Sequence, residues 1–205
     1  MKNITLTILI FVLSFPFNSF SEEVIINDPR SVAVIVNRDS NDLSFMDLKT
    51  KKIVGRVFLG KWVNPHMAVL TPDGRRVVTG GTRANRAYII DVATLKLIKS
   101  IPVDTAPEHL AITPDSRYYY QGNPDGDSVS IIDLVSLKRL KNLEGFAEPL
   151  NITMLPDGSK AYVANMGAHW VGVIDVKRHE LLKKIKVGDV PERSKLDPGK
   201  FLGEI

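Results

Sequence analysis

The chain of 205 residues contains no cysteine. This absence excludes disulfide bonds, zinc sites built on cysteine, iron–sulfur clusters and the CxxCH attachment of c-type haem. A haem group, if bound, would be held without thioether links. The fold must therefore be stabilised by a hydrophobic core, which a chain with 44% hydrophobic residues can supply.

Long apolar segments are absent after the first 21 residues. Those residues, MKNITLTILIFVLSFPFNSFS, contain Lys2, an apolar run from Ile4 to Phe17, and small residues at Ser19 and Ser21. This order is typical of a secretory signal peptide, whereas a membrane helix needs about 20 apolar residues. We expect residues 1–21 to be cleaved, with a retained anchor as the alternative. The mature protein is then predicted in the periplasm or outside the cell, with no membrane span.

The chain has no strong net charge of either sign. It contains 27 basic and 23 acidic residues, for a net charge of +4. No lysine- or arginine-rich run is present, so we expect no nucleic-acid partner. The sequence also lacks a nucleophile elbow, a P-loop, a dinucleotide fingerprint and an HExxH motif. Nothing specifies a reaction, and we expect a non-enzymatic protein without a cofactor.

What the sequence does contain is a repeat of about 42 residues. TPDGRRVVTGG, TPDSRYYYQGN and LPDGSKAYVAN begin at equal intervals. Prolines mark the same interval at Pro72, Pro114, Pro156 and Pro198. A second series of aspartates follows spacings of 44, 42 and 42, at Asp47, Asp91, Asp133 and Asp175. Two independent series with one period indicate a repeat architecture.

Each unit contains four short runs that favour strands, such as PHMAVLT, RRVVTGG, AYIID and LIKSIPV, joined by turns. No helical periodicity of useful length appears. A four-stranded sheet must stack on its neighbours to bury both faces, and radial stacking of such sheets gives a β-propeller. We predict an all-β propeller with blades at about 23–64, 65–106, 107–148 and 149–190, and a partial blade at 191–205.

The motif PDGSKAYVANMGAHWVGVIDVKRHELLKKIKVGDVP resembles the YVTN-type β-propeller repeat, and the resemblance covers nearly all of the mature chain. YVTN propellers are similar, more distantly, to the haem d propeller of dissimilatory nitrite reductases and to proteins of haem d biogenesis. The resemblance implies a binding scaffold, or in the more distant case a haem site. The sequence matches the repeat but shows no haem-site motif.

The number of blades leaves the ring open. EVIIND aligns with the innermost strand of the first blade, and a fifth inner strand is predicted near Ser194–Leu196. An unfinished blade leaves an exposed strand edge that can pair with another chain. The chain is then a piece of a larger ring, an arc that pairs with a second copy, or a small closed ring. We expect a protein partner or self-association through the open edge, rather than a clean monomer.

The repeated turns are predicted to be structural. Pro-Asp-Gly favours a turn with a positive φ at glycine, and Asp115-Ser116 departs from it, which predicts a different or strained turn. Each aspartate of the second series is followed three residues later by a residue whose N–H it can accept, which indicates a capped turn. The aspartates are therefore not interpreted as catalytic carboxylates.

Irregular loops on the opposite face are the predicted site of function. We call this face the loop face. The candidate ligand-binding residues of the loop face are His66, Arg83, Arg86, His109, Asn151, His169, Trp170 and Arg193. The repeat aligns His66 with Glu108, and His109 with Met67, Asn151 and Arg193. His179 belongs to the turn face and is discounted.

Several alternatives remain for these residues. The histidines could ligate a metal or haem, with His66 and His109 as the haem candidates, or serve as ordinary loop residues. NPDGDS at 123–128 is either a calcium loop or, as we favour, a polar turn. Arginines at 83, 86 and 193 could form an anion-binding rim.

Trp170 either stacks on a ligand or, as we favour, covers the blade. Three functions follow from these alternatives: an exported binding scaffold, a haem d-type propeller, and a structural repeat protein of the cell envelope.

Overall fold

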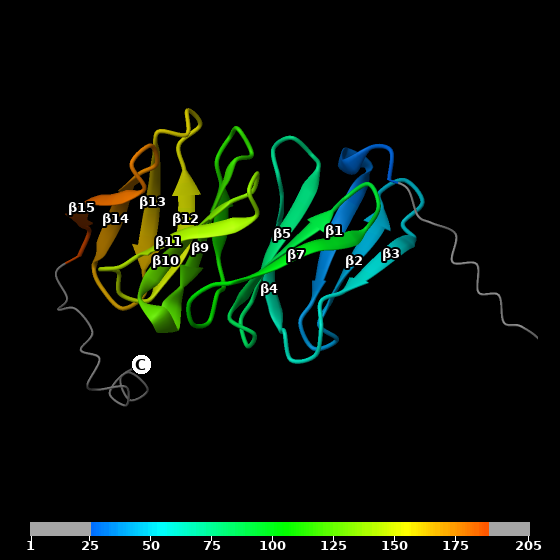
Figure 1. The fold of residues 1–205 in the computed structure, drawn as a ribbon, viewed down its shortest axis with the longest axis horizontal. Helices are drawn as coiled ribbons and strands as arrows, with labels where there is room; N and C mark the ends of the chain where they lie inside the picture. Colours follow the sequence, from blue (N-terminus) through cyan, green and yellow to red (C-terminus); the bar gives the residue numbers. More distant parts are fainter. Residues whose placement is uncertain (1–25, 189–205) are drawn as a thin grey trace, which may run out of the picture.

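The computed structural model describes residues 26–188, which form four antiparallel sheets in sequence order (Figure 1). The first sheet contains β1 (Val32–Asn37), β2 (Asp42–Asp47) and β3 (Ile53–Phe58). The second contains β4 (Pro65–Leu70), β5 (Arg76–Gly81), β6 (Arg86–Asp91) and β7 (Lys96–Pro102). The third contains β8 (Leu110–Ile112), β9 (Tyr118–Asn123), β10 (Ser128–Asp133) and β11 (Lys138–Leu143). The fourth contains β12 (Pro149–Met154), β13 (Lys160–Asn165), β14 (Trp170–Asp175) and β15 (Glu180–Lys186).

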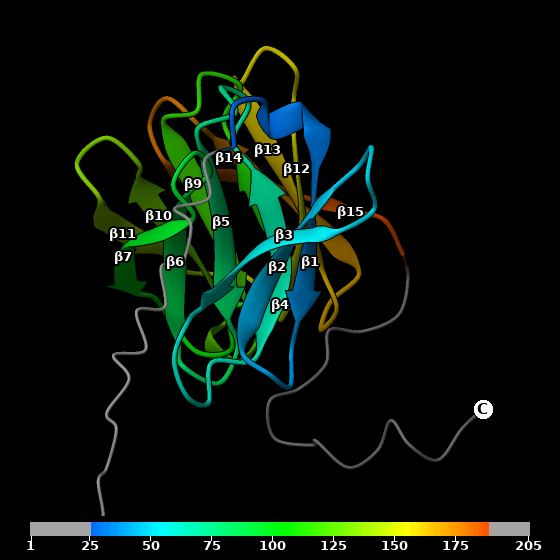
Figure 2. The same cartoon turned by 90° about the vertical axis from the view of Figure 1, so that its right-hand side faces the viewer.

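Every sheet is a meander in which consecutive strands pair, and the four sheets stack as an open, propeller-like arc. The predicted all-β propeller fold is confirmed. The first and fourth sheets lie at opposite ends of the row in Figure 1, and Figure 2 looks onto the first sheet, so the described residues do not close into a ring. No helix of the described residues is long and apolar enough to cross a membrane.

The first sheet differs from the prediction, because it has three strands within the described residues. The expected innermost strand on EVIIND begins outside them, and Ile26 lies beside the second sheet, where its N–H donates to the Ala93 carbonyl at 3.0 Å. Residues 1–21, Arg193 and the predicted strand at 194–196 also lie outside the described residues.

Alternating side chains of each strand serve two different cores, because successive residues point to opposite faces of a sheet. Val77 packs against the first sheet, whereas Val78 packs against the third. In β9, Tyr119 belongs to the core with the second sheet and Tyr120 to the core with the fourth. The inner sheets are therefore buried on both faces, as the repeat predicts.

The Pro-Asp-Gly turns have one geometry in all three described repeats. Gly74 and Gly158 have φ values of 73° and 70°, and Ser116 takes the same left-handed conformation at 60°. The departure at Asp115-Ser116 thus leaves the turn type unchanged and places a non-glycine residue in a strained conformation. In each turn the aspartate accepts the N–H two residues later, as Asp115 does from Arg117 at 3.0 Å.

The second aspartate series is confirmed as a set of caps. Asp47 accepts the Thr50 N–H at 2.6 Å, Asp91 accepts the Thr94 N–H at 2.8 Å, and Asp175 accepts the Arg178 N–H at 2.9 Å. Asp133 accepts two N–H groups, from Val135 and Ser136. These carboxylates close the turn before the last strand of each sheet, namely β3, β7, β11 and β15.

Glycine is required where one sheet meets the start of the next. A Cβ at Gly122 would lie 2.9 Å from the Pro149 carbonyl oxygen and 3.1 Å from that of Leu150. The repeat places Gly80 and Ala164 at the same position in the neighbouring sheets, and Ala164 is exposed. The missing side chain of Gly122 therefore allows the third and fourth sheets to pack closely.

Gly122→Ala is expected to lower the free energy of unfolding by about 1–3 kcal/mol, because backbone oxygens cannot move aside as a side chain can. Urea denaturation measures the loss. The matched control is Ala164→Gly, for which we expect about 0.5–1 kcal/mol from chain flexibility alone. A loss at Gly122 no larger than that of the control contradicts this packing.

Stability is expected to fall in acid. Hydrogen bonds from the Thr113 hydroxyl and the Arg117 N–H hold the pKa of Asp115 below its ordinary 3.8. The pKa is lowered from the same value at Asp47, Asp73 and Asp157. The folded state then binds fewer protons than the unfolded chain, so this stabilisation is present above pH 3.8 and is lost as the pH falls below it.

Urea midpoints compared at about pH 7 and about pH 3 test this expectation. Asp115→Asn should reduce the difference between the two midpoints. Equal midpoints for the unchanged protein would show that the turn carboxylates do not favour the folded state.

Candidate functional site

The loop face carries a repeated hydrogen bond that the sequence analysis missed. The side chains of Asn41, Asn85 and Asp127 accept the backbone N–H groups of Asn64, Ala106 and Glu148, at 2.8, 3.0 and 2.8 Å. All six residues have positive φ. Each bond joins one loop, between β1 and β2, β5 and β6, or β9 and β10, to the start of the next sheet. We call these three bonds the inter-sheet latches.

The latches correct the expectation that this face is irregular. Their acceptors follow spacings of 44 and 42 residues, which is the signal that could have revealed them. The next position in the series is His169, 42 residues after Asp127. His169 therefore lies at the end of the fourth sheet, where its carbonyl accepts the Val187 N–H at 2.9 Å.

Two of the predicted residues meet where the second and third sheets stack. His66 lies at the start of β4, and His109 directly precedes β8. Their ring centroids are 5.3 Å apart, with an interplanar angle of 39°. The Nδ1 atom of His66 is buried and has no hydrogen-bond partner. We call His66 and His109, together with Arg38, Asn64 and Glu108, the histidine cluster.

Burial favours a neutral His66. It lowers the pKa of His66 from 6.5, the carboxylate of Glu108 opposes this effect, and Arg38 and His109 act in the same direction as burial. The Arg38 guanidinium is held in place by donating from Nη2 to the Asn64 Oδ1 at 3.0 Å. A neutral imidazole has one donor and one acceptor nitrogen, so His66 can receive or give a hydrogen bond.

His109 is positioned through its backbone. Its carbonyl accepts the Gly122 N–H at 2.8 Å and the Gln121 Nε2 at 2.9 Å. Gln121 in turn accepts the hydroxyl of Tyr119, whose burial raises the pKa of that phenol. Hydrogen bonds from β9 to its carbonyl therefore fix His109, while its ring lies beside that of His66.

Other predicted residues do not join the cluster. Arg86 donates from Nε to the Ser100 Oγ at 2.5 Å and from Nη2 to the Ser100 carbonyl at 3.0 Å, which braces β6 against β7. Both bonds go to neutral groups and leave the guanidinium charged, so its assignment to an anion-binding rim stays a prediction. Asn151 is exposed on β12 of the fourth sheet. Arg193 lies outside the described residues.

Trp170 is buried in the core between the third and fourth sheets. Its ring lies 6.2 Å from that of Phe146, and the Lys184 Nζ sits 4.1 Å above it. The indole covers the blade and is not presented to solvent, so stacking on a ligand is excluded for this conformation.

The segment NPDGDS forms a short 3₁₀ turn at Pro124–Gly126, followed by Asp127 in the left-handed conformation. Asp127 serves as a latch acceptor, which agrees with a polar turn. Residues 26–188 contain no group of three or more histidine, cysteine or acidic side chains able to hold a metal ion.

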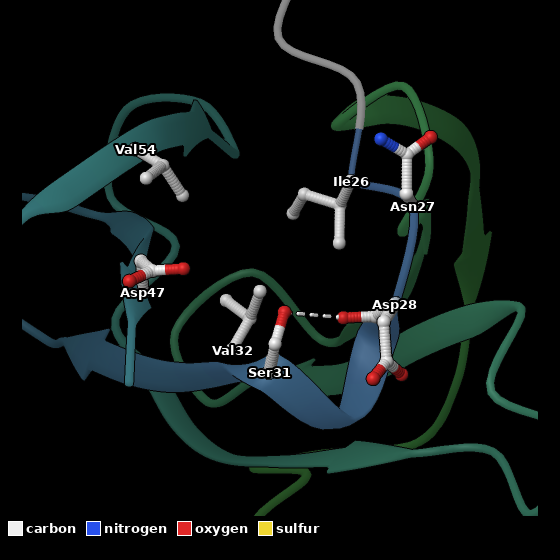
Figure 3. A pocket seen from close by; sticks show the side chains of 7 residues that line it. All are labelled: Ile26, Asn27, Asp28, Ser31, Val32, Asp47 and Val54. Atoms are coloured by element: carbon white, nitrogen blue, oxygen red, sulfur yellow. Dashed lines mark hydrogen bonds between the residues drawn. The ribbon is translucent and has the colours of Figure 1, made fainter. Parts of the chain in front are cut away.

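The turn face offers structural contacts instead. The Tyr120 hydroxyl lies 2.6 Å from His179 Nδ1, which ties the third sheet to the fourth. Figure 3 shows a hollow of about 320 Å³ at the first sheet, bordered by Ile26, Val32 and Val54. Its two carboxylates, Asp28 and Asp47, already accept backbone N–H groups. The polar groups of this hollow are thus already used in a turn and a cap.

A second hollow on the loop face contains Arg83, the remaining predicted residue, together with Arg38. It also includes Phe58, Lys61 and Trp62, which the sequence analysis did not select. The signal available for them was the segment GKWVNPH, in which a tryptophan stands next to a lysine in a loop.

Comparisons with known proteins show the fold and leave the family open. No family model and no curated protein matches the chain. Among solved structures, 1443 chains match, so the fold itself is too widespread to identify a function. One of them is Kuenenia stuttgartiensis Hydrazine Synthase, with a TM-score of 0.61 and 29% sequence identity. The alignment covers 63% of this chain and 38% of that one.

Asn85→Ala is expected to lower the free energy of unfolding by about 1–2 kcal/mol, because the Ala106 N–H loses its acceptor and alanine is strained at positive φ. Asn85→Gly removes the acceptor without the strain and should cost less. Chemical denaturation of both variants separates the two contributions. No loss in either variant contradicts the latch.

Proposed function

We propose that this protein is an exported, non-enzymatic β-propeller-like scaffold that binds a small molecule or a protein segment on its loop face, at the histidine cluster. The observation that carries the proposal is the buried, unpartnered Nδ1 of His66 beside the ring of His109. A buried polar atom without a partner costs about 1–3 kcal/mol, and a ligand can supply the missing hydrogen bond.

The position of the cluster supports binding. It lies where two sheets stack, and ligand sites commonly form between such units from a few polar groups on a rigid framework. The latch from Asn41 to Asn64 and the bond from Arg38 to Asn64 hold its edge in place. The opposite face is occupied by repeated turns, whose polar groups are used internally.

The remaining parts of the proposal come from the sequence. The leader at residues 1–21 supports export to the periplasm or beyond, and the repeat motifs support kinship with YVTN-type propellers. The absence of known catalytic motifs favours binding over catalysis. Because the alignment covers 38% of the hydrazine synthase chain, we assign no hydrazine chemistry to this protein.

A haem d-type propeller is the second candidate, since the unpartnered imidazole nitrogen of His66 has the donor chemistry of an axial haem ligand. In this alternative His66 or His109 would hold the iron, and the haem would supply the redox chemistry. A structural role in the cell envelope is the third candidate, and it predicts no ligand at the cluster.

A thermal-shift screen with haemin, zinc ions, small organic acids and short peptides tests the proposal. We expect a ligand that raises the melting temperature of the unchanged protein, with the shift at least halved in His66→Ala and His109→Ala. His179→Gln, on the turn face, is the matched control and should retain the shift. A Soret band that appears with haemin and is lost in His66→Ala selects the haem alternative.

Two results would contradict binding at the cluster. A shift that is equal in the unchanged protein and both cluster variants places the ligand elsewhere. A screen without any shift, combined with retention of the protein at the cell surface, favours the structural role.

A further inference from the structure

A hollow of about 270 Å³ lies on the loop face beside the histidine cluster, between the first and second sheets. It is bordered by Arg38, Asp39, Phe58, Lys61, Trp62 and Arg83. Arg38 belongs to both places, because its guanidinium also donates to Asn64 in the cluster. The hollow therefore adjoins the histidine cluster, which is the proposed binding site.

Positive charge dominates this hollow, with three cationic side chains against the single carboxylate of Asp39. The hydrogen bond from Arg38 goes to a neutral amide, so it orients the guanidinium without neutralising it. Within the described residues, no ion pair joins Lys61 or Arg83 to an acidic side chain. An excess of oriented cations in a concave site attracts anions, and arginine suits carboxylate and phosphate groups.

Two large aromatic side chains are exposed at the same place. Trp62 is 74% exposed and Phe58 is 61% exposed. The repeat aligns Trp62 with Phe146, which is buried in the core between the third and fourth sheets. Phe146 thus packs inward in its loop, whereas Trp62 is exposed to solvent at the aligned position.

The backbone of this loop adds a further observation. Trp62 has a φ of 61°, a conformation that is rare for a bulky residue. Two residues later, Asn64 is also left-handed, at 52°, as the other latch residues are. Residues held in such conformations cluster at ligand sites, where the surrounding structure fixes them. Here the strained backbone presents an indole next to three cations.

From these contacts we infer that the hollow binds a small organic anion with a flat aromatic ring. A carboxylate or phosphate is received by Arg38, Lys61 and Arg83, and the ring stacks on the indole of Trp62. The inference rests on the proposed function and names the class of ligand for the loop face. The ligand needs both its negative charge and its aromatic ring, because the cations bind the first and Trp62 stacks on the second.

Isothermal titration of the purified protein at low salt tests the inference with two anionic probes, 2-naphthoate and adenosine 5′-monophosphate. Their neutral counterparts are 2-naphthamide and adenosine. We expect at least one anion to bind, with an affinity at least tenfold above that of its neutral counterpart and with a change in tryptophan fluorescence. The anion that binds distinguishes a carboxylate ligand from a phosphate ligand.

Variants of the hollow locate the binding. Lys61→Ala/Arg83→Ala and Trp62→Ala should each weaken it at least tenfold, and all three side chains are exposed, so the fold is retained. The matched control is Lys49→Ala/Lys52→Ala, which removes the same charge from exposed positions at the turn after β2. That variant should bind as the unchanged protein does.

The inference is overturned by no binding of either anion at millimolar concentration, by equal binding of the neutral counterparts, or by unchanged affinity in Lys61→Ala/Arg83→Ala. The variant His66→Ala distinguishes binding at the hollow from binding at the histidine cluster. Anion binding that survives His66→Ala but not Lys61→Ala/Arg83→Ala supports the hollow, even if the screen shows no ligand at the histidine cluster. Loss of binding in His66→Ala alone overturns the hollow and supports the cluster.

Discussion

Stacking of one sheet on the next is the interaction on which this structure depends. Each inner sheet sends alternate side chains to opposite neighbours, as Val77 and Val78 do in β5 and Tyr119 and Tyr120 do in β9. Burying a large apolar side chain contributes about 1.5–3 kcal/mol, and the chain has no disulfide to replace that contribution. A sheet isolated from its neighbours would expose apolar residues on both faces.

The same stacking places polar groups that lie far apart in the sequence. The inter-sheet latches fix the segment that begins each new sheet, and Gly122 allows the next inner strand to approach. His66 and His109 come from different blades and meet because β4 and β8 are neighbouring inner strands. The site proposed on the loop face thus depends on the contacts between blades rather than on any one blade.

The 42-residue period predicted the strands, the turns and the aspartate caps, because these depend on residues close together in the chain. It also placed His66 and His109 on one face. Their contact was harder to predict, since the repeat aligns His109 with Met67 rather than with His66, and the meeting depends on the stacking distance. The brace between Arg86 and Ser100 was missed for a related reason, as its hydrogen bonds join two neighbouring strands. Trp62 is exposed in a turn and Trp170 is buried at the start of β14, a difference that composition does not reveal.

Cross-linking across the stack tests the account most directly, because the chain has no native cysteine to interfere. A variant carrying His66→Cys and His109→Cys should form an intramolecular link rapidly with a short thiol-reactive reagent. The control, His66→Cys with Asn151→Cys, spans the second and fourth sheets and should link far more slowly. Equal rates in the two variants, or no link in the first, would contradict the stacking of the second sheet on the third and the site built on it.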